Sequence, residues 1–181
     1  SLVYTGTLYS DNSCKRDLAP LFKALDKAIS SGRIDKNKIV FEYAGTTSYL
    51  FERFSRMYPN VPTIDHELLS RDKALELQSR SSLLVVASWN TFAQRGVLTG
   101  KVFEYLSKDI PIIGLCSGDV PNSSLRSLIE ECSAGICYEE ADESTHSLLI
   151  PFLEQQYRQW KNRGITTRGL DATERGVQYS Y

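Results

Sequence analysis

Short apolar runs alternate with longer segments of helical periodicity along nearly the whole chain, and this alternation constrains the fold more than any other feature. Two of the runs, residues 83–87 and 112–115, contain no polar position. A strand with one face in water alternates polar and apolar side chains, so uninterrupted runs are typical of central parallel strands that are covered on both faces. The sequence therefore predicts an α/β protein.

The expected architecture is a doubly wound, Rossmann-like parallel sheet of about six strands with flanking helices. The pattern predicts strands at residues 2–6, 38–43, around Thr63, 83–87, 110–115 and 135–138. It predicts helices at residues 17–30, 47–57, 71–79, 100–107, 123–131 and 148–160. We interpret residues 1–181 as a single domain with an irregular C-terminal tail at 165–181, and as a fragment of a longer protein, since no initiator Met precedes the first strand.

Composition excludes several classes of function. With 21 basic and 22 acidic side chains the net charge is −1, so no global field attracts nucleic acid or anionic lipid. No apolar run has the length of a membrane span or the flanks of a signal peptide, and we expect a soluble, cytoplasmic chain. The four cysteines form no CxxC pair and only two histidines are present, so no metal site is expected. Reduced thiols are favoured over two disulfides.

Residues that follow strands are the first candidates for binding, because ligands of open parallel sheets lie beyond the carboxyl ends of the strands. Gly6 and Thr7 end the first predicted strand, and the basic pair Lys15 and Arg16 opens the next helix. A glycine lets backbone amides approach an oxyanion, and a guanidinium can fork around a phosphate. An ordinary strand-to-helix turn is an equally good interpretation.

A second candidate segment is residues 95–106, which only superficially resembles a P-loop. Arg95 stands where that loop needs glycine, and Val102 where it needs Ser or Thr. A helix start with small residues remains at Thr99 and Gly100, and free amides there favour a diphosphate.

Glu104 lies about one turn into that helix, where its carboxylate could accept hydrogen bonds from vicinal ribose hydroxyls. The alternative is an ordinary helix residue that pairs with Lys101 or Lys108. His66 follows another predicted strand and could line a nucleobase pocket, although a lone histidine is often incidental. The chain lacks the GxGxxG, GxSxG and DxD patterns, which disfavours dinucleotide redox chemistry, a hydrolase triad and a metal held by an acidic pair.

Residues 4–8, 85–88, 100–107 and 110–114, with Leu21, Ala24 and Leu25 of the first helix, together resemble one family. The chain is similar, over residues 2–138, to the C-terminal, nucleotide-sugar-binding domain of GT-B glycosyltransferases, specifically the retaining group-1 transferases of bacterial polysaccharide synthesis. The resemblance implies one half of a two-domain hexosyltransferase-like enzyme whose substrate is a UDP- or GDP-linked sugar and which needs no other cofactor. It also implies a missing N-terminal domain that binds the acceptor and makes any membrane contact, including a peripheral position at the inner face.

The resemblance assigns roles to individual residues. Glu104 would hold the ribose hydroxyls, and Gly6 and Thr7 would hold the diphosphate through backbone groups, with Arg16 as the basic residue. The other candidates are the amides offered to the distal phosphate, the neighbouring lysine, and the loops that flank the nucleobase: Val97, Leu98, Thr99, Lys101, Gly45, Asp65 and His66.

One position departs from the family, which commonly carries a second glutamate earlier in the 95–106 segment. Gly96 stands there, so the contact to the donor sugar and the catalytic residues are unassigned, with Glu52 and Asn90 considered as substitutes. We expect the isolated chain to bind donor without turnover. The alternatives are a sugar-nucleotide epimerase of the same architecture and a non-catalytic nucleotide-binding module; a dehydrogenase ranks last.

Overall fold

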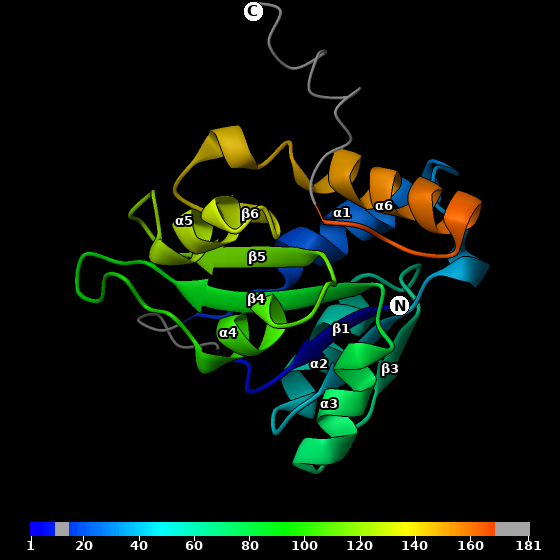
Figure 1. Cartoon of the computed structure of the whole chain (residues 1–181), viewed down its shortest axis with the longest axis horizontal. Helices are drawn as coiled ribbons and strands as arrows, with labels where there is room; N and C mark the ends of the chain where they lie inside the picture. Colours follow the sequence, from blue (N-terminus) through cyan, green and yellow to red (C-terminus); the bar gives the residue numbers. More distant parts are fainter. Residues whose placement is uncertain (10–14, 169–181) are drawn as a thin grey trace, which may run out of the picture.

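A computed structural model describes residues 1–9 and 15–168 of the chain and confirms the predicted α/β fold. All six strands are parallel, in the order β3-β2-β1-β4-β5-β6 (Figure 1). The strands are β1 (Leu2–Thr5), β2 (Phe41–Ala44), β3 (Thr63–Asp65), β4 (Leu83–Trp89), β5 (Ile112–Ser117) and β6 (Gly135–Glu139). The order reverses between β1 and β4, which is where an open α/β sheet forms its binding crevice.

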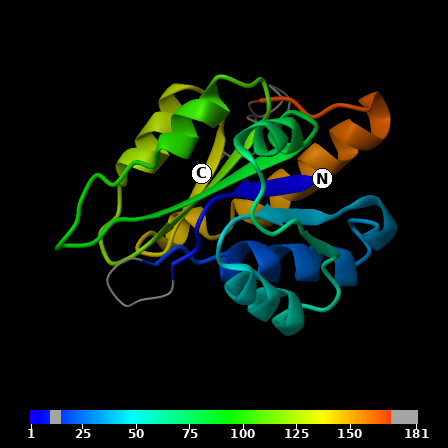
Figure 2. The same cartoon turned by 90° about the horizontal axis from the view of Figure 1, so that it is seen from below.

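Six α-helices among the described residues form two layers, one on each face of the sheet (Figure 2). They are α1 (Ala19–Ser30), α2 (Ser48–Met57), α3 (Arg71–Ser79), α4 (Gly100–Leu106), α5 (Ser124–Glu131) and α6 (Leu149–Arg163). Helices α1, α2 and α6 share one buried apolar cluster with the sheet, and α3, α4 and α5 share the other. Both faces of the central strands are thus covered, as their uninterrupted apolar runs predicted.

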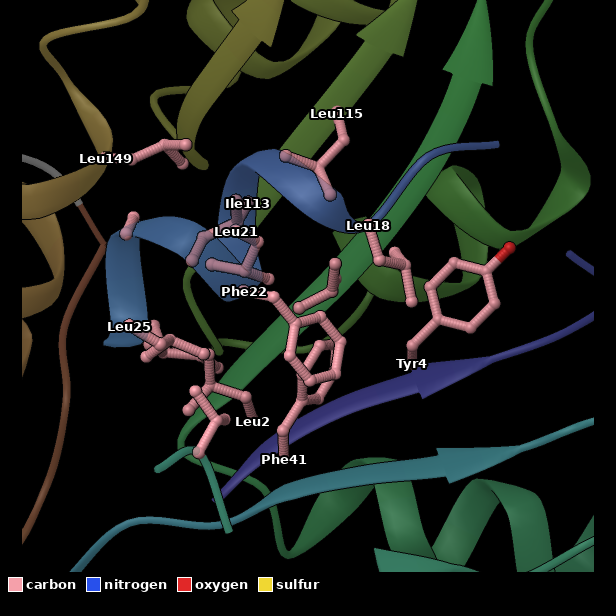
Figure 3. Close-up of a cluster of buried hydrophobic side chains, with 14 of the residues drawn as sticks. Leu2, Tyr4, Leu18, Leu21, Phe22, Leu25, Phe41, Ile113, Leu115 and Leu149 are labelled. Carbon is pink, nitrogen blue, oxygen red and sulfur yellow. The ribbon is translucent and has the colours of Figure 1, made fainter. Parts of the chain in front are cut away.

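The larger cluster is centred on α1. Leu21, Phe22 and Leu25 of this helix pack against side chains of β1, β2 and β5, among them Leu2, Phe41 and Ile113 (Figure 3). The buried positions recur at helical spacing along α1, and this pattern is the signal from which the helix was predicted. Burial of so many apolar side chains supplies most of the favourable free energy of folding.

Element boundaries differ from the predicted ones by a few residues, for local reasons. Strand β2 begins at Phe41 instead of residue 38, because Lys36–Lys38 forms a 3₁₀ turn that the Asp35 side chain caps. Strand β4 continues two residues beyond the expected end, to Trp89. Helix α6 also runs further than expected and ends where Gly164 adopts a φ of 74°.

Other sequence expectations fall only partly within the described residues. Residues 165–168 form no helix or strand, while the rest of the predicted tail, 169–181, lies outside the described part. Cys116, Cys132 and Cys137 are free thiols, and Cys14 also lies outside it. Within the described ranges, no helix has the length and apolar character of a membrane span. In the same ranges no group of three or more His, Cys, Asp or Glu side chains could hold a metal ion.

Candidate functional site

A cavity of about 440 Å³ opens where β1 and β4 end, at the reversal of strand order. Its lining brings together segments that are far apart in the sequence: Gly6 after β1, Arg16 before α1, and the start of α4. The residues of the lining that carry polar groups include Arg16, Thr99, Lys101 and Glu104. The crevice predicted from the strand ends therefore exists, and several of the predicted candidates lie in it.

A second cavity, of about 290 Å³, adjoins the first. The two share Thr5, Gly6, Lys101 and Glu104, so they are neighbouring compartments of one crevice. The rest of the lining of the second includes the loop after β2, the segment before α3 and the start of α3: Gly45, Thr46, Leu68, Leu69 and Arg71. Glu104 thus lies between a compartment that contains Arg16 and one that is partly apolar.

Arg16 has a donor without a partner. Its Nη1 donates a 2.7 Å hydrogen bond to the carbonyl of Thr7, and its guanidinium lies over the rings of Tyr9, at 4.6 Å, and Trp89, at 5.5 Å. The buried Nε has no hydrogen-bond partner. Thr7 and two aromatic rings therefore hold the guanidinium in place, and its Nε–H makes no hydrogen bond there.

Thr99 presents a second buried polar atom without a partner, its Oγ1. Thr99 precedes α4 at the capping position, yet its side chain makes no capping hydrogen bond. Unpartnered buried polar groups each cost about 1–3 kcal/mol, so both residues favour a ligand that supplies hydrogen-bond acceptors to this compartment. Helix α4 has only seven residues, so its dipole is not counted as a contribution to ligand binding.

The carboxylate of Glu104 is anchored at one oxygen. Its Oε1 accepts hydrogen bonds from Gln78 Nε2 at 2.6 Å and from Lys101 Nζ at 3.0 Å. Partial burial acts to raise the pKa of Glu104, but the hydrogen bonds from Gln78 and Lys101 outweigh it and the pKa lies below its ordinary value. Glu104 is therefore ionised at neutral pH. The ion pair with Lys101, which the sequence offered as the alternative to a binding role, is present, and the same carboxylate lines both compartments.

Gly6, Thr7 and Gly45 lie together at the ends of β1 and β2. The Gly6 amide donates to the Ala44 carbonyl at 2.9 Å, so the sheet already uses the amide that we expected to face a diphosphate. Thr7 Oγ1 lies 3.1 Å from Thr46 Oγ1. A Cβ on Gly45 would collide with the Gly6 carbonyl oxygen and the Tyr43 hydroxyl, so only glycine allows these two loops to approach.

His66, Val97 and Leu98 lie outside the linings of both compartments. His66 Nε2 is 2.7 Å from the buried carboxylate of Glu42, which Arg80 also contacts. The Val97 carbonyl accepts a 2.7 Å hydrogen bond from Ser88 Oγ, and Leu98 is exposed on its loop. Asp65 Oδ1 is used within its own turn, where it accepts from the Glu67 amide.

The structure does not bring either proposed substitute for the missing glutamate into the crevice. Gly96 has a φ of 70°, a conformation that glutamate rarely adopts. Asn90 is buried and binds the Val120 carbonyl and the Gly96 amide. Glu52 lies on the exposed face of α2 and pairs with Arg56.

Three residues that the sequence did not single out contact the side chains that line the crevice. Gln78 reaches Glu104 from α3, and Tyr9 and Trp89 hold Arg16. Gln78 and Glu104 are 26 positions apart, so no local pattern could have paired them. Tyr9 lies two positions after Thr7, and this closeness in sequence to a predicted residue was a signal that could have found it.

A separate cavity of about 400 Å³ lies on the face of the sheet that α1 and α6 cover, between α1, the ends of β5 and β6, and the start of α6. Its charged lining is mixed, with Lys23 and Lys27 beside Asp17 and Glu140. None of the buried unpartnered polar atoms of the described residues belongs to its lining. The crevice at β1 and β4 is therefore the better candidate site.

No family model matches the sequence, and no curated protein matches it either. Among solved structures, WaaG, a glycosyltransferase involved in lipopolysaccharide biosynthesis, superposes with a TM-score of 0.60 at 13% identity, over 90% of this chain and 39% of that one. The GtfA/B complex superposes with a TM-score of 0.50 at 12% identity, over 92% of this chain and 33% of the other. The chain thus spans well under half of each neighbour. Its six-stranded parallel sheet with flanking helices is the Rossmann-like fold of one half of a GT-B glycosyltransferase.

Proposed function

We propose that this chain is the donor-binding domain of a retaining glycosyltransferase that transfers a sugar from a nucleoside diphosphate to a hydroxyl acceptor in polysaccharide or glycan synthesis. One observation carries the proposal: Arg16 and Thr99, each with a buried polar atom that has no hydrogen-bond partner, line one compartment together with the ionised Glu104, which also lines the next. The glycosyltransferase-like fold supports the same assignment.

The order of groups along the crevice suits a UDP- or GDP-linked sugar. The diphosphate would lie beside Arg16 and Thr99, where hydrogen-bond donors lack partners. The ribose would lie at Glu104, whose carboxylate can accept hydrogen bonds from vicinal hydroxyls. The base would enter the compartment bounded by Gly45 and Leu68.

In the proposed reaction the acceptor hydroxyl replaces the nucleoside diphosphate at the anomeric carbon, through an oxocarbenium-like state. Negative charge grows on the diphosphate as the glycosidic bond breaks. A guanidinium that is already fixed by Thr7, Tyr9 and Trp89 stabilises this charge without reorganising. The acceptor and the remaining catalytic groups would come from the N-terminal domain of the longer enzyme.

Calorimetric titration with UDP and GDP tests the donor role. Glu104→Ala should weaken binding of the preferred nucleotide about tenfold to a hundredfold, because it removes charge-assisted hydrogen bonds to the ribose. Glu52→Ala, at an exposed position on α2, is the matched control and should bind as the original chain does. Equal affinities for the Glu104→Ala variant and the original chain would contradict the proposal.

A non-catalytic nucleotide-binding module is the second candidate. Gly96, with its left-handed backbone, favours this alternative because it replaces the glutamate that would face the donor sugar. Sugar transfer by the longer parent chain would exclude it.

A further inference from the structure

Gln78 is a polar side chain at a fully buried position of α3. It is 0% exposed, and its Nε2 donates to Glu104 Oε1 at 2.6 Å and to Thr5 Oγ1 at 2.9 Å. Both hydrogens of the amide nitrogen are therefore used. One goes to the carboxylate of the crevice and the other to the end of β1.

The orientation of this amide follows from the charge of its partner. Ionised Glu104 can only accept hydrogen bonds, so a flipped amide would place its oxygen against the carboxylate. In the orientation that results, Gln78 Oε1 is buried without a partner. An unpartnered buried acceptor destabilises the folded state, so packing alone does not favour glutamine here.

A second set of contacts fixes the same corner of the crevice. The Thr5 amide donates to the Tyr105 hydroxyl at 3.2 Å, and Thr5 Oγ1 lies 2.9 Å from the same hydroxyl. Tyr105 follows Glu104 on α4 and is fully buried. Helices α3 and α4 and strand β1 therefore meet in one hydrogen-bonded network directly behind the Glu104 carboxylate.

We propose that Gln78 is a positioning residue that holds Oε1 of Glu104 against the back of the crevice and leaves Oε2 to bind the pentose hydroxyls, so that the site prefers ribonucleotides to 2′-deoxyribonucleotides. Within the described residues, both hydrogen bonds to this carboxylate are made at Oε1. The inference rests on the proposed function, since it needs a nucleotide in the crevice.

The test is calorimetric titration with UDP, GDP and their 2′-deoxy forms. Gln78→Met keeps the shape of the side chain and removes both donors. We expect it to lower affinity for the preferred ribonucleotide about fivefold and to change affinity for the 2′-deoxy form little. Gln156→Met is the matched control, because Gln156 is equally buried but lies in α6 and donates to the Thr167 carbonyl. This control should bind as the original chain does.

Two further readouts separate positioning from a general structural role. In a Glu104→Ala background, Gln78→Met should have no further effect on nucleotide affinity, because nothing remains to be positioned. In the Glu104-containing chain, loss of the Gln78 hydrogen bond raises the pKa of Glu104. The acid limb of the binding curve against pH should then move to higher pH.

The outcomes of these titrations distinguish failure of the proposed function from failure of the positioning role of Gln78. If the original chain binds neither UDP nor GDP, the proposed function and this inference fail together. If it binds a ribonucleotide and the Gln78→Met variant keeps the same preference and the same pH profile, the positioning role alone is wrong. If Gln78→Met does not fold, Gln78→Asn withdraws the donors by one methylene and should give the same changes in preference and in pH profile.

Discussion

At the scale of single residues, the crevice is lined by side chains whose neighbours hold them in place while one polar atom has no hydrogen-bond partner among the described residues. Arg16 is held by the Thr7 carbonyl and two aromatic rings, and Nε is left over. Glu104 is held at Oε1 by Gln78 and Lys101. Such fixed groups lose little conformational entropy when a ligand binds.

Replacing Arg16 should show how much the guanidinium contributes. Arg16→Ala is expected to weaken nucleoside diphosphate binding about tenfold to a hundredfold, since a charged hydrogen bond contributes about 1.5–3 kcal/mol. Arg16→Lys should recover only part of this loss, because an ammonium lacks the planar fork and stacks less well on Tyr9. Calorimetry would measure both, with Arg56→Ala, an exposed arginine of α2, as the control. A full-affinity Arg16→Ala variant would remove Arg16 from the site.

At the scale of elements, the ends of strands also organise helices that have no part in the crevice. Glu139, the last residue of β6, is buried and accepts hydrogen bonds from the amides of Asn122 and Ser123, at 2.9 and 2.6 Å. Arg126 of α5 contacts the same carboxylate at 3.4 Å. Glu139 therefore satisfies the two amides that precede α5, and the Ser123 side chain caps the helix itself by accepting from the Arg126 amide; α4 has no side-chain cap.

Glu139→Gln should destabilise the domain by about 2 kcal/mol, because the amides of Asn122 and Ser123 lose a buried, charged acceptor. Glu130→Gln is the matched control, since Glu130 also contacts Arg126 but is exposed; it should cost no more than about 0.5 kcal/mol. Urea unfolding followed by circular dichroism would measure both changes. Equal unfolding midpoints for the two variants would show that the buried Glu139 carboxylate contributes nothing to stability.

At the scale of the whole molecule, the described residues form one Rossmann-like unit around a single parallel sheet. The chain spans 39% of the WaaG chain and 33% of the matched chain of the GtfA/B complex. The crevice lies at the strand ends, at the reversal of strand order, and under the proposed function the acceptor is bound by residues outside this unit.

We therefore expect the 181-residue chain to bind a donor without turning it over. A panel of UDP- and GDP-linked sugars should raise the melting temperature for at least one member, because a ligand that binds only the folded state stabilises it. Product analysis after long incubation with the same donor and a hydroxyl acceptor should find no transfer. A measurable transfer rate would show that this domain carries the catalytic groups itself.

Local pattern was enough to predict most of the elements and the edge of the sheet where the candidate crevice lies. Helix and strand periodicities are properties of short windows, so α3, for example, was predicted with its observed bounds. Arg16, Thr99 and Glu104 were predicted for one crevice because the ends of parallel strands share one edge, and the structure brings them there.

Tertiary structure alone decided which polar atoms are free and which are used. His66 follows a strand as a binding residue would, yet it pairs with Glu42, and the Gly6 amide belongs to the sheet. Gln78 gave no signal although it holds Glu104. Periodicity reports only which face of an element is buried, whereas hydrogen-bond partners are set by packing between segments that are far apart in the chain.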